Sequence, residues 1–491
     1  MYADVSTAQG RGAVTVQAGA RTLLIDGAWH ASRDGRTSAV VSPGDGATLA
    51  RVAQAGAEDL RDAVGAARRA FDHGPWPRMS GKERAQILYD AADLIEEDAA
   101  ELARRQSLEM GKPLRFGLAE DVPFAAMALR YFAALVSQER GAGQPGAASA
   151  TRYTLREPLG VVAALTSFHH PLAMTAAIAA PALASGNTLV HKPSGTAPLS
   201  ALRFAEHCVA AGLPPGVLNV LTSSGPELGP RLAAHDGVDK FAFAGSLRGG
   251  RHVGAACAPA LVAADLDLGR RNAHIVFADA CLEYAARRAA AAVLPGSGEF
   301  RAAGARILVQ RPVYHAFRDL LADHVRAFGP ADPLLRTTRL GPVARADHLE
   351  LLTDYLGWSR SHGGRVLAGG VSDGLYHQAT LLAPADLDAA ARMPEMFTPL
   401  ALVLPFEDSA EAVAAANEGR GTHDCTVYTA DLKRAHGVAR AVRAATCRIS
   451  SCDVTEAEPD EGDDNGQVRE IGVDCLDSFT RPKTMWIDVA L

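Results

Sequence analysis

The stretches LDLGRRNAHIVFADA (residues 266–280) and LPGSGEFRAAGARILV (residues 294–309) decide the fold of this chain. They open the second of two blocks. In the block before them, most of the short apolar runs are followed by about 20 residues with helical spacing, as a doubly wound α/β sheet requires. Five such runs, beginning at residue 161, suit parallel strands buried on both faces: VVAALTS, NTLVHK, VLNVL, DKFAF and LVAAD. The pattern predicts an α/β fold.

The order of motifs in and around these stretches resembles the aldehyde dehydrogenase superfamily. Its pattern is L-E-L-G-G-K, then I-V-F-x-D-A, then F-x-N-x-G-Q-x-C-x-A-x-x-R. This chain matches it over residues 275–280 and, around residue 301, at Gly298, Ala303 and Arg306. The resemblance covers about residues 22–490. It implies an aldehyde dehydrogenase-like fold, with a Rossmann-type cofactor domain, a second α/β catalytic domain and a small β arm for oligomerisation.

The resemblance also implies boundaries. We expect an N-terminal tail (1–21), a dinucleotide-binding domain (22–140 and 160–265), a catalytic-type domain (266–450), an oligomerisation arm (141–159 and 478–491), and an acidic substrate-mouth loop with a C-terminal segment (451–477). Apolar spacing predicts helices over 57–71, 81–107, about 114–140, 409–419 and 431–445. Ser80 and Glu83 form a plausible capping box for the second helix. Residues 453–464 hold seven acidic residues and one proline, which is typical of a solvated loop.

The three catalytic positions of the family have all changed in this chain. In the family, Cys is the nucleophile, Glu is the general base and Asn holds the oxyanion; these positions hold Arg301, Asp267 and His169. A guanidinium stays protonated and cannot attack a carbonyl. Asp is one methylene shorter than Glu, and a misplacement of about 1 Å can cost on the order of a hundredfold in rate. The resemblance therefore implies that Cys-dependent aldehyde oxidation is lost, which leaves a pseudoenzyme or the partner of an active relative.

Other readings stay open. Cys452 could replace the missing thiol and restore an NAD(P)-dependent aldehyde oxidoreductase, although a free Cys is usually a small buried hydrophobe. Arginines near the position of the family's active site could fill a pocket that no longer binds substrate, by pairing with Asp267, Glu299 and Glu395. They could instead bind an anionic substrate, with His169 as acid or base in non-covalent redox or acid–base chemistry. These arginines are Arg270, Arg271, Arg301 and Arg306.

Most of the family's nicotinamide cofactor motifs are retained. Lys192-Pro193-Ser194 matches K-P-S, and Ser246 is expected at a helix N-terminus, where free N–H groups favour a phosphate. Gly195 stands where the family has an acidic residue that accepts from the adenosine ribose hydroxyls, so NADP is at least as compatible as NAD. The positions that resemble the cofactor site are Thr166, Phe168, Lys192, Ser194, Gly195, Gly225, Gly229, Phe243, Gly245, Ser246, Leu268, Glu395 and Phe397.

The composition excludes several other classes of protein. A formal net charge of -7 gives no reason to expect binding to nucleic acid or to an anionic membrane. Seven cysteines without regular spacing form neither a disulfide framework nor a metal site, which favours a reducing cytoplasm. We expect a small-molecule ligand, no bound metal, and a homodimer or homotetramer, with an active relative as an alternative partner.

Overall fold

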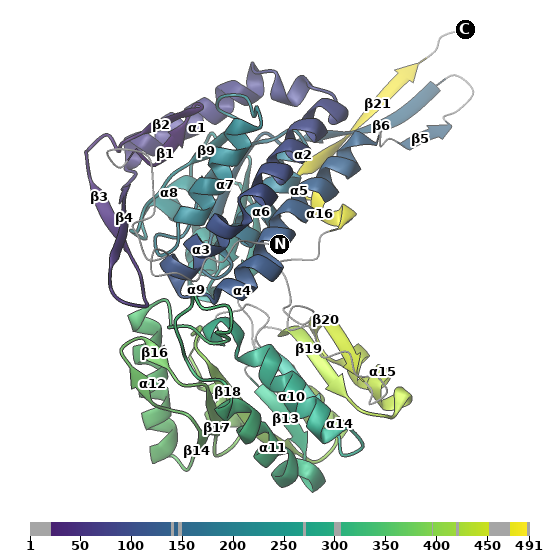
Figure 1. Cartoon of the computed structure of the whole chain (residues 1–491). Coiled ribbons are helices and arrows are strands. Elements are labelled where there is room, and N and C mark those ends of the chain that lie inside the picture. The colour runs from purple at the N-terminus through teal and green to yellow at the C-terminus, as the bar shows by residue number, and fades with distance from the viewer. Residues whose placement is uncertain are drawn as a thin grey trace.

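The computed structural model describes residues 21–138, 142–145, 150–268, 272–298, 306–394, 396–418, 422–450 and 472–488. Two seven-stranded sheets with helices packed against them form the body, and a narrow β arm projects from the half that contains the first sheet (Figure 1). The predicted α/β class is confirmed.

The first sheet has the strand order β11-β10-β7-β8-β9-β1-β2. Its five strands from β7 to β11 are parallel to one another, whereas β1 pairs antiparallel with β9. Strands β7, β8 and β10 are almost wholly buried, as the apolar runs predicted. The expected domain boundary at residue 265 falls inside β11. The strands are β1 (Leu23–Ile25), β2 (Ala28–His30), β7 (Val161–Thr166), β8 (Thr188–Lys192), β9 (Leu218–Val220), β10 (Lys240–Gly245) and β11 (Ala263–Leu268).

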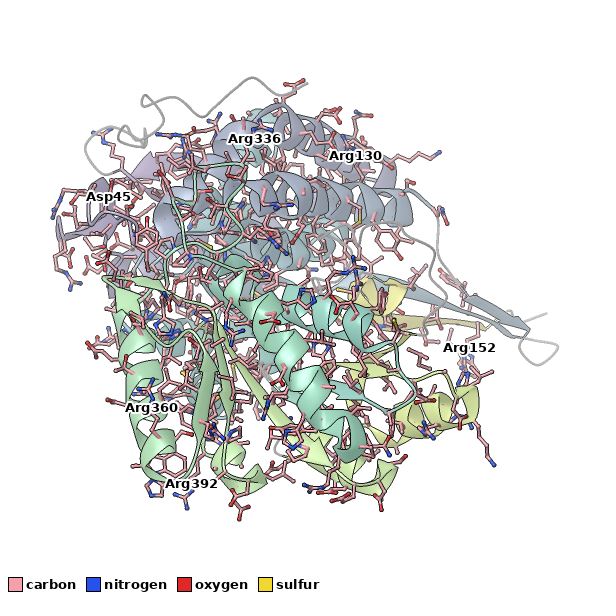
Figure 2. All side chains as sticks on the ribbon, turned by 60° about the horizontal axis from the view of Figure 1, so that its bottom comes forward. Asp45, Arg130, Arg152, Arg336, Arg360 and Arg392 are labelled. Carbon is pink, nitrogen blue, oxygen red and sulfur yellow. The ribbon has the colours of Figure 1, made fainter. Side chains whose placement is uncertain are left out.

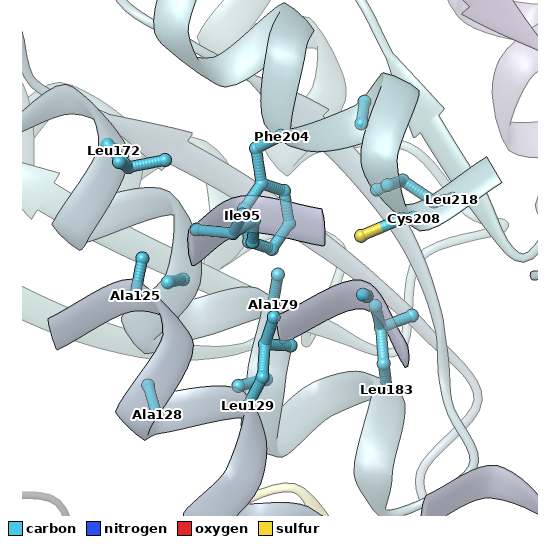
Figure 3. Packing of buried hydrophobic residues seen from close by; sticks show 14 of the residues in the cluster. Ile95, Ala125, Ala128, Leu129, Leu172, Ala179, Leu183, Phe204, Cys208 and Leu218 are labelled. Atoms are coloured by element: carbon cyan, nitrogen blue, oxygen red, sulfur yellow. The ribbon is translucent and has the colours of Figure 1, made fainter. Parts of the chain in front are cut away.

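Nine helices of the described chain accompany this sheet. Part of their core is shown in Figure 3, where Phe204 and Ile95 lie among leucines and alanines of neighbouring helices; full burial of one such side chain contributes about 2 kcal/mol. The helices are α1 (Ala57–Asp72), α2 (Gly81–Glu97), α3 (Ala99–Met110), α4 (Leu114–Phe116), α5 (Val122–Ser137), α6 (Pro171–Ala184), α7 (Leu199–Ala210), α8 (Leu228–Ala233) and α9 (Leu247–Cys257).

Two of the predicted helices are interrupted. The capping box is confirmed, since Ser80 Oγ accepts from Glu83 N and Ser80 N donates to Glu83 Oε2. The helix expected over 81–107 breaks at Asp98, whose carboxylate binds Arg203 and His207 of α7 at 2.6 and 2.9 Å. The helix expected over about 114–140 is divided by a π-helical turn at Gly117–Asp121.

The second sheet has the strand order β14-β17-β18-β13-β12-β19-β20. From β17 to β20 in this order, each strand is parallel to the next, whereas β14 pairs antiparallel with β17. Separate apolar clusters fill the two faces of the sheet. The strands are β12 (Ala273–Val276), β13 (Arg306–Gln310), β14 (Arg365–Ala368), β17 (Thr380–Ala383), β18 (Leu400–Phe406), β19 (Thr422–Tyr428) and β20 (Ala444–Ser450).

The second sheet is covered by α10 (Leu282–Val293), α11 (Tyr314–Arg326), α12 (Ala346–Ser361), α13 (Leu387–Ala391), α14 (Ser409–Ala416) and α15 (Leu432–Ala441). The helix expected over 431–445 therefore ends early, because residues 444 and 445 already belong to β20. Two hairpins complete this part of the description: β3 (Thr37–Val41) with β4 (Thr48–Ala53), and β15 (Ser372–Asp373) with β16 (Tyr376–His377).

The arm consists of β5 (Ala142–Pro145), β6 (Ala150–Pro158) and β21 (Thr480–Asp488), with the short α16 (Val473–Asp477) at its base. β6 pairs antiparallel with both other strands, so the end of the chain lies beside residues 150–158. Large apolar side chains on the arm are exposed, among them Leu155 (42%) and Trp486 (63%). Arg152, labelled in Figure 2, lies over the Trp486 ring at 5.7 Å. Large apolar side chains that are exposed together on one projecting element can mark an interaction surface.

Among the described residues, no helix has both the length and the apolar character that a bilayer crossing needs.

Candidate functional site

Four aromatic side chains meet just beyond the end of β7, and we call them the aromatic cluster: Phe168, His169, His348 and Phe397. The His169 ring stacks on Phe397, with ring centroids 4.6 Å apart and planes at 24°. Phe168 meets the edges of His348 and Phe397 at 5.6 and 5.8 Å. His169 is 1% exposed, and its Nδ1 lies 2.7 Å from Ser167 Oγ. The imidazole is therefore packed against protein on the side of Phe397.

A buried ionic group, formed by Lys112, Asp121 and His170, contacts the turn that carries His169. His170 has φ 58° and ψ 52°, a left-handed conformation that is uncommon outside glycine. Its Nδ1 lies 2.8 Å from both Asp121 Oδ1 and Lys112 Nζ, and Lys112 also pairs with Asp121. Burial alone would raise the pKa of Asp121, but Lys112 and His170 outweigh it and lower this pKa to about 2. The backbone therefore turns at His170 instead of continuing as an extended segment.

The loop before residue 299 is fixed against the same cluster. Gly296, Ser297 and Gly298 all have positive φ, and Ser297 Oγ donates to Gly341 O at 2.8 Å. A Cβ at Gly298 would collide with the carbonyl oxygen of Thr398, the residue after Phe397. Only glycine fits at position 298. Gly298 therefore lies beside the aromatic cluster.

A buried lysine stands at the end of β8. Lys192 Nζ donates to Pro193 O at 3.2 Å, and that is its one hydrogen bond within the described part of the chain. Burial lowers the pKa of Lys192 to about 8. Next to it, burial and then the charge of Lys192 lower the pKa of His191 to about 3. This neutral imidazole lies 2.9 Å from the hydroxyl of Thr166, at the end of β7. The ammonium of Lys192 keeps two donors for a ligand.

Gly195 and Ser194 follow this lysine. Ser194 Oγ accepts from the backbone N–H of Thr196 at 3.2 Å. A Cβ at Gly195 would lie 2.5 Å from Ser224 Cα and 2.9 Å from Ser223 O. The loop at 223–224 thus occupies the space that a side chain at position 195 would need.

The glycines expected to approach a cofactor differ in their surroundings. Gly225 has open space on its Cβ side, whereas Gly229 packs against Leu165, within the first turn of α8. The Phe243 ring covers Gly245 closely enough to exclude a Cβ there. Gly225 thus lies at a surface open to a ligand, and the other two glycines serve packing.

Helix α9 begins directly after Ser246, as the sequence predicted. Ser246 is the N-cap, and its Oγ accepts from Gly249 N at 3.0 Å. Backbone N–H groups in the first turn of a helix, together with its dipole, favour an anion. On the neighbouring β11, Asp267 is partly buried and in register with Ala244, and Leu268 packs on Gly250. Ala244 of β10 and Asp267 of β11 therefore lie on adjacent strands at the same end of the sheet.

Several expected site residues lie outside the described residues, and nothing further is stated about their positions: Arg270, Arg271, Glu299, Arg301, Glu395 and Cys452. Arg306 is described, and our expectation that it could join them is wrong. It is 1% exposed and donates to Ala415 O and Ala416 O at 2.8 and 3.3 Å. It therefore caps the C-terminus of α14, where a cation is favoured.

Sequence reasoning missed Lys112, Asp121 and His348. Lys112 lies in a segment that resembles the family, but nothing in the motif signals its pairing with a histidine 58 residues later. His348 lies in α12, whose spacing is that of an ordinary helix and gives no sign that this ring contacts Phe168 and Phe397. Within the described ranges, no group of three or more His, Cys, Asp or Glu residues could hold a metal ion. The arrangement offers donors to an anionic ligand and a buried aromatic surface.

Comparisons with known proteins identify chains of similar sequence and fold. The family model described as "Aldehyde dehydrogenase family" matches residues 29–485. The NADP/NAD-dependent aldehyde dehydrogenase PuuC of Escherichia coli is 33% identical over 473 residues, 95% of each chain. The structure of gamma-glutamyl-gamma-aminobutyraldehyde dehydrogenase from Burkholderia cenocepacia superposes with a TM-score of 0.89 at 35% identity, covering 95% of this chain and 96% of that one. PnpE in complex with nicotinamide adenine dinucleotide has a TM-score of 0.89 at 34% identity, covering 96% and 98%.

Proposed function

Because this chain belongs to the aldehyde dehydrogenase family and has its fold, we propose that it binds NADP or NAD and has lost Cys-dependent aldehyde oxidation. It would then act as a pseudoenzyme or as the partner of an active relative. The observation that carries the proposal is Arg301 at the position of the nucleophile in the family motif.

The assignment of residue 301 rests on the fixed frame around it. Gly298 matches the motif, and its contact with Thr398 anchors the loop beside the aromatic cluster. Three residues of chain span at most about 10 Å. Arg306, which matches the motif on the other side, begins β13. A guanidinium within this frame offers donors and a permanent charge, and it cannot form a thiohemiacetal.

The described catalytic positions also support the loss of the parent reaction. An oxyanion needs preorganised donors directed at the carbonyl oxygen. His169 stands at the oxyanion position, but its ring is buried and stacks on Phe397. The same burial argues against His169 as the acid or base of a repurposed enzyme, because substrate could reach the ring only if the aromatic cluster opened.

The residues present fit a nicotinamide dinucleotide. Lys192 has unused donors in a buried position, Gly225 is open, and the N-terminus of α9 can hold a phosphate. When bound, the nicotinamide would supply a hydride acceptor. The site lacks the carboxylate that would repel a 2′-phosphate, because position 195 is glycine and the loop at 223–224 fills the space beside it. We therefore propose that NADP binds at least as well as NAD.

We propose further that the exposed apolar side chains of the arm join subunits into a homodimer or homotetramer. Leu155, Trp486 and Ile487 would be covered in such an assembly. Replacement of Trp486 by Glu should lower the assembly state in analytical ultracentrifugation without unfolding the body, because the ring is largely exposed in the single chain. An unchanged sedimentation profile would contradict this use of the arm.

Two measurements test the proposed function together. Titration of NADPH and NADH against nicotinamide fluorescence should show saturable binding. An aldehyde panel with NAD and NADP should show no turnover in the wild type and little recovery in Arg301→Cys, because His169 and Asp267 remain. Aldehyde oxidation by the wild type that Cys452→Ala abolishes would overturn the loss of oxidation and leave cofactor binding intact.

A further inference from the structure

Two cysteines face each other across the outer edge of the second sheet. β20 is the last strand of that sheet, and its register with β19 places Cys447 opposite Cys425. Cys425 is fully buried in the apolar cluster on one face of the sheet, and Cys447 packs against the same cluster while remaining partly exposed. The pair belongs to none of the positions that resemble a catalytic or cofactor site.

The geometry of this pair suits a covalent link. Neighbouring strands lie about 4.8 Å apart, and residues in register on parallel strands point to the same face. Disulfides join Cα atoms that are about 4.4–6.8 Å apart. The two thiols are close enough to influence each other's pKa: the interaction raises the pKa of Cys425 and lowers that of Cys447. Neither strand has to move far for the sulfurs to bond.

We propose that Cys425 and Cys447 form a redox modification site, in which a hydroperoxide converts the two thiols into a reversible disulfide between β19 and β20. The Cys447 sulfur attacks the peroxide O–O bond, which gives a sulfenic acid and releases water or an alcohol. The Cys425 sulfur then attacks the sulfenic sulfur, and the hydroxyl leaves as water. The two thiols lose two electrons, and the peroxide gains them.

The surroundings distinguish the roles of the two cysteines. The non-covalent interaction with the Cys425 thiol, and then the charge of Arg448, lower the pKa of Cys447, against the effect of its partial burial. The non-covalent interaction with the Cys447 thiol, and then burial, raise the pKa of Cys425. The thiolate is the reactive form of cysteine. Cys447, which is also the more exposed of the two, is thus the residue oxidised first, and Cys425 is the resolving thiol.

The test uses the full chain and hydrogen peroxide. Wild-type protein is treated with one equivalent of peroxide and then denatured and alkylated, and the thiols that react with the alkylating reagent are counted. The sequence has seven cysteines, so the count should fall from seven to five (7 − 2), and dithiothreitol should restore it. A non-reducing tryptic digest should contain one new linked species that joins peptide 421–433 to peptide 444–448.

Variants separate the two steps. Cys425→Ser should yield no disulfide and a dimedone adduct on Cys447, whereas Cys447→Ser should retain its remaining thiols at this peroxide dose. Cys281→Ser is the matched control, because Cys281 is exposed and does not belong to the apolar cluster that contains the pair; it should form the same link as the wild type. A wild-type count that stays at seven, or a link from Cys447 to another cysteine such as Cys452, would overturn the proposal, and neither result depends on whether a variant folds.

Discussion

Replacement of Lys192 by Met should separate cofactor binding from folding. The side chain is buried at the end of β8, and its ammonium has one hydrogen bond, to Pro193 O, within the described residues. Met preserves the length and apolar character of the stem and removes only the charge and its donors. If the ammonium holds a phosphate or ribose of the cofactor, the affinity should fall while the fold remains.

The size of the effect follows from the kind of contact. A hydrogen bond to a charged group contributes about 1.5–3 kcal/mol, which corresponds to a dissociation constant about 10- to 150-fold higher in the variant. The pH dependence has a definite sign. Burial lowers the pKa of Lys192 to about 8, so the ammonium is present below that pH and is lost above it. Wild-type affinity should therefore fall as the pH rises through about 8, and the Lys192→Met affinity should show no such step.

The assay is a titration of NADPH followed by nicotinamide fluorescence at a series of pH values from 6 to about 9.5, chosen to span this pKa. Lys82→Met is the matched control, because Lys82 is an exposed lysine in the first turn of α2, and it should bind as the wild type does. Equal dissociation constants for wild type and Lys192→Met, or a wild-type affinity that does not change across this range, would refute the reasoning.

Three further predictions concern stability and cofactor choice. Asp121→Asn removes the carboxylate that pairs with buried Lys112 and should cost about 3–5 kcal/mol in urea unfolding; a loss below 1 kcal/mol would contradict a tightly held group. Burial raises the pKa of Glu109 to about 7 from 4.5, so its contribution to stability is present below about pH 4.5 and is lost as the pH rises through 7. The loss is about 3 kcal/mol, and unfolding midpoints of wild type and Glu109→Gln at pH 5 and 8 should show it only in the wild type. Gly195→Glu should weaken NADP and NAD binding together, because the new side chain meets Ser224; a selective gain in NAD affinity would contradict this.

The first sheet was predictable because its signal is local. The runs around Val161–Thr166 and Thr188–Lys192 are short and almost wholly buried, as strands of a parallel sheet covered on both faces are. The break at Asp98 was not predictable, because its carboxylate serves Arg203 and His207 more than 100 residues later. Helical spacing continues through residue 98 and gives no sign of that contact.

The candidate site shows the same division. The positions of Lys192 and Ser246 were predictable because the motifs place them at the end of a strand and at the start of a helix, which are local features of the sequence. Arg306 was misassigned because its acceptors, Ala415 O and Ala416 O, come from α14. His348 joins the aromatic cluster through Phe168 and Phe397, and such tertiary contacts leave no pattern in one sequence.

A single-turnover experiment tests the loss of Cys-dependent aldehyde oxidation directly. The protein is in excess over an aldehyde, NADP or NAD is saturating, and the fluorescence of the reduced nicotinamide is followed. No reduced cofactor should form, because a guanidinium at position 301 cannot add to the carbonyl. A burst of reduced cofactor equal to the aldehyde added, and absent in Cys452→Ala, would contradict this loss.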